Sequence, residues 1–444
     1  MSNPLVPRRR LLQGIALGGG LAMVGGACAP TARLSPDTRP DPTKPEGEDT
    51  LPQVEHIVIY MQENHSFDNY FGMLGRGDGF TLGPDGLPTN SNPGPNGQLV
   101  FPRRAINAHA APHVSQNWND THDSINGGAM DGFGRISPDS LQYYDGAQLP
   151  FYYGLAREFV LCDRWFTSCR GQTHPNRRYL QAATSAGLVQ TDVGKVLASP
   201  DAPNGTIWDR LNANNISWAD YAYDLPDIAL FPRVFLANTS KVKTIQQFLW
   251  DCSTGQLPSV SIVSPGDTAF SEEPSKDVQR GEAYSAMLVN ALMQSPAWEK
   301  TVMFFTYDEH GGFYDHVTPP PAVAPDDIAP DINLANGDRP GGFDEYGVRV
   351  PAMVISPFAK RDYVSHVVHD HTSILRFIET KWNLGALTFR DANASNLLDT
   401  LDFEAKAFAE PPVLPAPALP DGVSLDEPGP ALPGPTGGPN SVPA

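Results

Sequence analysis

The chain has 444 residues, of which 40% are hydrophobic and 18% charged, with 40 glycines and 44 prolines. This length suits one large domain or two to three ordinary ones, and the composition excludes a coiled coil and a multi-pass membrane protein. The formal charge of −19 repels phosphate backbones, so we expect no nucleic-acid partner.

The N-terminus has the pattern of an export signal. Arg8–Arg10 precede a short, Gly-rich apolar run that ends at Ala27. This run is shorter than the ~20 residues that cross a membrane, so residues 1–28 are expected to be a signal, of the twin-arginine type in preference to a plain secretory one. Cys28 follows Gly-Gly-Ala, which resembles a lipoprotein site without its usual Leu. We expect an exported protein, secreted, periplasmic or attached to the envelope through a lipid on Cys28.

Two further segments differ from the body of the chain. Residues 29–52 and 411–444 are rich in proline and have no apolar periodicity. We expect the first to be an exposed linker and the second a disordered tail. The body, residues 53–410, is long enough for one large domain.

Apolar runs and helical patterns alternate along this body. Buried strands are predicted at His56–Met61, Val260–Ser264, Val302–Tyr307 and Ala352–Ile355, and helices at Asn176–Ala186, Gly281–Gln294 and Thr372–Trp382. This alternation predicts an α/β fold, in which a mostly parallel sheet is flanked by helices and carries elaborated loops. In such sheets ligands bind beyond the carboxyl ends of the strands.

Polar residues follow two of the predicted strands. Glu63 and Asn64 come after the first, and Asp308 and Glu309 after the third. Carboxylate and amide oxygens suit a divalent cation, which would also offset the cost of burying adjacent acids. The alternatives are an ordinary acidic loop at the second position and, at the first, a cap on a short helix through Phe67–Phe71.

A third position of interest is Thr173, two residues before Pro175. Proline is common in the first turn of a helix, so the Thr173 hydroxyl is expected near a helix N-terminus. It can be a cap, which is the commoner role, or a nucleophile whose alkoxide is stabilised by the helix end and a metal. His122 lies in a stretch of irregularly spaced histidines, for which packing in a loop is the ordinary interpretation.

Four stretches, taken together, resemble the bacterial phosphoesterase family of non-specific phospholipases C and related acid phosphatases. They are VEHIVIYMQENHSFDNYFG at 54–72, the segment 162–177, TYDEHGGFYDHV at 306–317 and DHTSIL at 370–375. The resemblance implies an alkaline-phosphatase-like core with a metal-assisted site. Glu63, Asn64, Asp308 and Glu309 match the ligands of a divalent cation, whose identity the sequence leaves open, Thr173 matches the nucleophile, and His122 resembles a histidine that contacts phosphate.

One position departs from the family. Where members often have Glu-His-Pro, this chain has Glu272-Glu273-Pro274, so Glu273 takes the place of a catalytic histidine. The first expectation for function is a phospholipase C that cleaves phosphatidylcholine-like diesters. The alternatives are an acid phosphatase acting on monoesters and, from another class, a non-catalytic envelope lipoprotein that binds a phosphorylated or lipid ligand.

Overall fold

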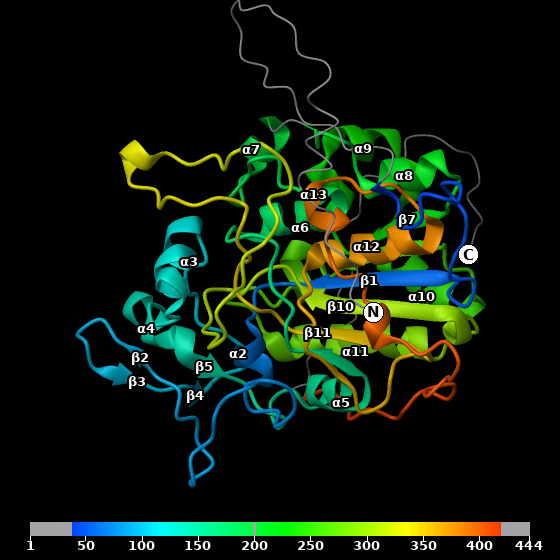
Figure 1. The fold of residues 1–444 in the computed structure, drawn as a ribbon. Coiled ribbons are helices and arrows are strands. Elements are labelled where there is room, and N and C mark those ends of the chain that lie inside the picture. The colour runs from blue at the N-terminus through cyan, green and yellow to red at the C-terminus, as the bar shows by residue number, and fades with distance from the viewer. Residues whose placement is uncertain (1–37, 199–200, 419–444) are drawn as a thin grey trace, which may run out of the picture.

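The structure, a computed structural model, describes residues 38–198 and 201–418. It confirms the α/β architecture, with helices covering a central sheet (Figure 1). Among the described residues this sheet has eight strands in the order β12-β6-β11-β10-β1-β9-β7-β8. Their bounds are β1 (His56–Gln62), β6 (Val160–Cys162), β7 (Trp218–Ala222), β8 (Val242–Thr244), β9 (Val260–Ser264), β10 (Thr301–Tyr307), β11 (Ala352–Ile355) and β12 (Val364–Ser365).

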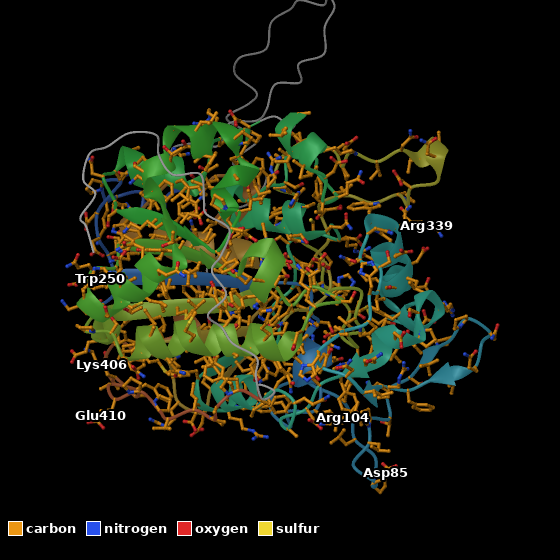
Figure 2. The ribbon with its side chains drawn as sticks, turned by 180° about the vertical axis from the view of Figure 1, so that it is seen from behind. Asp85, Arg104, Trp250, Arg339, Lys406 and Glu410 are labelled. Atoms are coloured by element: carbon orange, nitrogen blue, oxygen red, sulfur yellow. The ribbon has the colours of Figure 1, made fainter. Side chains whose placement is uncertain are left out.

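Helices lie on both faces of the sheet. α6 and α12 pack together on one face, and α10 and α11 pack together on the other (Figures 1 and 2). The helices are α2 (Phe67–Phe71), α3 (Trp118–Ile125), α4 (Phe133–Ile136), α5 (Pro150–Glu158), α6 (Thr173–Ala182), α7 (Val193–Ala198), α8 (Ile207–Ala213), α9 (Pro232–Ala237), α10 (Ile245–Thr254), α11 (Val278–Met293), α12 (His371–Trp382) and α13 (Phe389–Ala392). None of the helices in the described part of the chain has the length and apolar character needed to cross a membrane.

The predicted strands all form, and those at the centre of the sheet are mostly parallel, as expected. β1 pairs in parallel with β9 and β10, and nearly every residue of these strands is buried because helices cover both faces. β11 runs antiparallel to both of its neighbours. β7 was not predicted because a buried acid, Asp220, interrupts its apolar pattern; its Oδ2 accepts the Ile228 N–H at 2.9 Å.

A lobe of loops and short elements extends beyond the carboxyl ends of β1 and β10 (Figure 1). It contains α3, α4 and the short strands β2 (Asn92–Pro93), β3 (Leu99–Val100), β4 (Arg103–Arg104) and β5 (Gln142–Tyr143). These segments are the elaborated loops expected from the sequence, and they lie on the side of the sheet where ligands bind in this architecture.

The described part of the expected linker lies against the body. The Gly47 and Thr50 N–H groups donate to the carbonyls of Trp382 and Lys381 at 2.9 and 2.7 Å. The Lys381 ammonium donates to Asp49 at 2.7 Å. Residues 38–52 are therefore fastened to α12 rather than free, and in the tail residues 411–418 also touch the body, where Leu414 packs on the core. The expected signal at 1–28 and the rest of the tail lie outside the described residues.

Candidate active site

The end of β1 buries two polar side chains. Glu63 and Asn64 follow the strand directly, and their side chains are buried. Asn64 has a left-handed backbone, with a φ of 69°, which asparagine tolerates better than most residues. Among the described residues, neither Oδ1 nor Nδ2 of Asn64 has a hydrogen-bond partner. Leaving a buried amide unpaired is costly, so this side chain is a candidate ligand.

The end of β10 brings two carboxylates to the same place. Gln62 lies opposite Tyr307 in the parallel β1–β10 pair, so the residues after both strands emerge at one edge of the sheet. The Asn64 N–H donates to Oδ1 of Asp308 at 3.2 Å, and the Glu309 N–H donates to the same oxygen at 2.7 Å. The two strand ends that carry the four expected ligands thus lie side by side, joined by the backbone N–H groups of Asn64 and Glu309 on Asp308.

A glycine allows this close approach. Gly311 has a φ of 64°, and a Cβ at this position would lie 2.0 Å from the carbonyl oxygen of Asn64. Its N–H donates to Oε2 of Glu309 at 2.8 Å. The loop after β10 therefore turns back onto the end of β1 only because residue 311 has no side chain.

Both acids of this loop are buried, and burial changes their ionisation. It raises the pKa of Asp308 to about 7 and the pKa of Glu309 to about 8, because the charged forms lose their water. The Arg177 guanidinium opposes this effect at Asp308. A divalent cation would favour the charged forms in the same way and more strongly.

Thr173 is the first residue of α6 and not its cap. Gln172 occupies the N-cap position and makes no capping hydrogen bond with its own side chain, while the Thr191 hydroxyl accepts the His174 N–H of the first turn. The helix begins three residues before the predicted start, which places Pro175 within its first turn, where proline is tolerated. The structure therefore gives the Thr173 hydroxyl no capping role, and the side chain is half-buried.

Thr173 faces a cavity of about 110 Å³ at the edge of the sheet. Glu63, Asp227 and Glu273 contribute carboxylates to its wall, and Arg177 contributes a guanidinium. Glu273 is 40% exposed at its side chain and pairs with Lys276 at 3.3 Å. The expected nucleophile, one expected metal ligand and the residue that replaces the family histidine thus line one cavity.

His122 is placed elsewhere. It lies on α3, where Nδ1 is 2.7 Å from the Trp118 carbonyl oxygen and its ring contacts the Trp118 ring. It packs against Gly341, in the extended loop where Arg339 is labelled in Figure 2. Burial lowers the pKa of His122 to about 4. His122 is not among the residues that line the cavity of Thr173, so this structure does not bring the two together.

Two charged residues of the site, Arg177 and Asp227, were not predicted from the sequence. Arg177 is almost completely buried and contacts Glu63, Asp227 and Asp308 at 3.3, 2.9 and 3.1 Å. Arg177 stands in one of the matching stretches, four residues after Thr173, which was the available signal for it. Asp227 belongs to a 3₁₀ turn, Asp227–Leu230, in a segment without any recognised motif.

A second acidic cluster is paired with a buried arginine side chain. Asp68, Asp315 and His316 each offer a ligand atom within 4.8 Å of the others. The fully buried Arg349 guanidinium contacts Oδ1 of Asp315 at 2.9 Å and Oδ1 of Asp68 at 3.2 Å. Burial alone would lower the pKa of His316, but the hydrogen bond and charge of Asp68 outweigh it and raise this pKa to about 9. We interpret this cluster as a structural ion network.

The residues at the two strand ends have the donor chemistry of a divalent-metal site, although within the described residues only Asp68, Asp315 and His316 place their ligand atoms within 4.8 Å of one another. All four offer oxygen, from three carboxylates and one amide, which is the donor set that hard cations prefer. The unpartnered Oδ1 of Asn64 supports this assignment, as does Oε1 of Glu309, which also has no hydrogen-bond partner within the described residues.

Comparison with known proteins identifies relatives along most of the chain. The model of the "Phosphoesterase family" matches residues 54–385. "Phospholipase C B" of Mycobacterium tuberculosis is 32% identical over 83% of this chain and 81% of its own length. "Non-specific phospholipase C6" of Arabidopsis thaliana is 31% identical over 78% of this chain and 72% of its own length.

Similarity to solved structures is much weaker. An alkaline phosphatase superfamily protein from Vibrio parahaemolyticus covers 75% of this chain and 78% of its own, with 12% identity and a TM-score of 0.36. The family model and the sequence relatives show that the chain belongs to the phosphoesterase family and is a hydrolase of phosphoric esters.

Proposed function

We propose that this protein is a phospholipase C, which hydrolyses the phosphodiester bond of phosphatidylcholine-like lipids with Thr173 as the nucleophile. The observation that carries the proposal is the position of Thr173, whose side chain lines a cavity together with Glu63 at the end of β1. Its hydroxyl has no capping role that would explain it. Two sequence relatives bear the name phospholipase C, which supports the choice of reaction.

The reaction has two steps. The Thr173 hydroxyl loses its proton and forms a bond to phosphorus, while the bond to the diacylglycerol oxygen breaks and diacylglycerol leaves as the protonated alcohol. The headgroup phosphate remains on Thr173 as an ester, and water then cleaves this bond, which releases the phosphorylated headgroup and restores the hydroxyl. Glu63, Asn64, Asp308 and Glu309 would hold a divalent cation. Such a cation would supply positive charge that stabilises the alkoxide of the nucleophile and the phosphate oxygens. The N–H groups at the start of α6 add to this charge.

Of the two residues expected to contact phosphate or move a proton, the geometry favours Glu273 over His122. Glu273 lines the cavity and His122 does not. A carboxylate repels the second negative charge of a phosphomonoester, and Glu63 and Asp227 line the same wall. The charges therefore favour a diester over the monoester that an acid phosphatase requires.

One wall of the cavity favours a lipid over a small polar ester. Leu225, Pro226, Leu230 and Pro265 line it, and Leu225 remains 51% exposed at the surface. Apolar side chains at the mouth of a polar site can contact the glycerol and the first carbons of the acyl chains. This arrangement supports the choice of phospholipid.

A chromogenic phosphodiester and the matching phosphomonoester, each with and without a chelator, test the proposal. We expect faster turnover of the diester, no turnover after chelation and recovery when metal is returned. Turnover that ignores the chelator would contradict the metal site, and a preference for the monoester would favour the phosphatase alternative.

Export is a separate proposal, which rests on Arg8–Arg10 and the apolar run after them. Replacing both Arg9 and Arg10 with Lys should leave the precursor in the cytoplasm, because twin-arginine export requires the arginine pair. Normal export of this variant would favour a plain secretory signal. Mass analysis of the mature N-terminus tests the lipid on Cys28, and a start at any other residue would exclude it.

A further inference from the structure

Arg177, a residue of α6, contacts three other parts of the active site: the end of β1, the end of β10 and the turn at Asp227. Its guanidinium donates from Nε to Oδ2 of Asp308 at 3.1 Å, from Nη2 to Oε1 of Glu63 at 3.3 Å and from Nη1 to Oδ1 of Asp227 at 2.9 Å. Nη2 also reaches the carbonyl oxygens of Met61 and Gln62 at 3.4 Å. One side chain of α6 thus touches the ends of β1 and β10 and the 3₁₀ turn at Asp227.

The planar fork of arginine suits this position. Its three nitrogens point in fixed directions, so they can address three carboxylates at once, whereas a lysine ammonium is a single point of charge. The side chain is 6% exposed, so its contacts are little screened by solvent. The guanidinium therefore fixes the distance between α6 and the strand ends.

The contacts of Arg177 can affect Thr173 because the two residues lie close together on α6. The two residues are four apart on α6, so their side chains lie on the same face of the helix. Both line the cavity. A shift of the guanidinium by a fraction of an ångström would move the Thr173 oxygen with it.

We propose that Arg177 is the positioning residue for the nucleophile: it docks α6 onto the metal-ligating ends of β1 and β10 and thereby sets Thr173 at its distance from them. Asp227 holds the guanidinium in this orientation from the opposite side. The Gln181 side chain of α6 donates to the Asp227 carbonyl oxygen at 2.9 Å, so the turn and the helix are joined at two points. This inference rests on the proposed role of Thr173.

Asp227→Asn and Arg177→Lys test the inference without emptying the site. Deleting Arg177 outright would leave several buried carboxylates without a counter-ion and endanger folding. Asp227→Asn keeps Arg177 and all four metal ligands. The matched control is Asp251→Asn: Asp251 is also buried, and its carboxylate accepts from Lys243 at 2.8 Å and from Gln247 at 2.7 Å, but it does not line the cavity.

The readouts are the single-turnover rate of phosphothreonine formation with a chromogenic diester, the KM and the metal content. We expect both test variants to lower the rate constant about 10- to 100-fold, since small misplacements of reacting groups cost this much. Metal content and KM should stay near the wild-type values, and Asp251→Asn should react normally.

Three results would overturn the inference while leaving the proposed function intact. They are wild-type rates in both variants, a loss of metal in proportion to the loss of rate, and a raised KM at unchanged rate constant, which would indicate direct substrate contact. If the wild-type protein itself formed no phosphothreonine, the proposed nucleophile would be wrong and the inference would fail with it.

Discussion

Replacing Thr173 with alanine should separate activity from stability. The hydroxyl is proposed to attack phosphorus, and removal of a nucleophile from a catalytic unit costs about 10⁴- to 10⁶-fold in turnover. Stability should hardly change, because Gln172 and not Thr173 is the N-cap of α6, and no capping hydrogen bond is lost. For such a half-buried side chain we expect a change within about 0.5 kcal/mol.

Two control variants sharpen this experiment. Thr173→Ser keeps the oxygen and loses only a methyl group, so it should retain substantial activity. Thr191→Ala is the matched threonine of the same cavity, and its hydroxyl accepts the His174 N–H at 3.3 Å. It should cost about 0.5–1.5 kcal/mol for that hydrogen bond and leave most of the activity.

The measurements are initial rates with a chromogenic diester, urea denaturation, metal content and rapid-quench trapping of phosphate on Thr173. The expected pattern is an inactive but stable Thr173→Ala beside an active but weakened Thr191→Ala. A Thr173→Ala variant that keeps its activity and loses about 1 kcal/mol of stability would identify the residue as a cap and refute the covalent mechanism.

Three further predictions concern charge. Burial raises the pKa of Asp308 to about 7 and the pKa of Glu309 to about 8, whereas both pKa values are about 4 in the unfolded chain. Between these pH values the metal-free folded protein therefore binds protons that the unfolded chain has already lost. Its stability should therefore fall from about pH 4 to pH 8 and be restored by metal, as thermal denaturation with and without chelator can show; a flat profile in both forms would contradict the raised values. Arg349→Met leaves the buried acids around it unpaired and should cost about 3–5 kcal/mol in urea denaturation, while the half-exposed Arg339→Met should cost less than about 0.5 kcal/mol; equal effects would show that burial does not matter here. Glu273→His should raise monoester turnover relative to diester turnover at acidic pH, because an imidazolium attracts the second phosphate charge, and an unchanged ratio would place residue 273 outside the phosphate contact.

The sequence predicted the centre of the sheet well, because parallel strands buried on both faces need continuous apolar runs. The same reasoning selected Glu63 and Asp308, since the ends of neighbouring parallel strands meet at one edge. It did not predict the reversed direction of β11, because a four-residue apolar run carries no information on its orientation. Nor did it predict that residues 38–52 lie on α12, since this segment makes the contacts mostly through its backbone N–H and carbonyl groups, which any sequence offers.

The site was harder to predict where it depends on distant contacts. Arg177 and Asp227 are fifty residues apart, and no pattern in either segment predicts the ion pair that joins them. His122 was selected through resemblance alone, and the packing of α3 against Trp118 and Gly341 decides its actual surroundings. Thr173 was correctly placed at the start of a helix. The sequence could not show whether it or a neighbour is the N-cap, because a shift of one residue in the helix start changes the N-cap residue.

The lack of room for a side chain at Gly311 has a consequence for how related sequences diverge. A single methyl group there would meet the Asn64 carbonyl oxygen at 2.0 Å and force the loop of Asp308 and Glu309 away from β1. Every residue proposed as a metal ligand would still be present in the sequence, yet the two strand ends would no longer meet. A relative can therefore keep all the oxygen-bearing residues of this site and lose the site itself through the smallest substitution available.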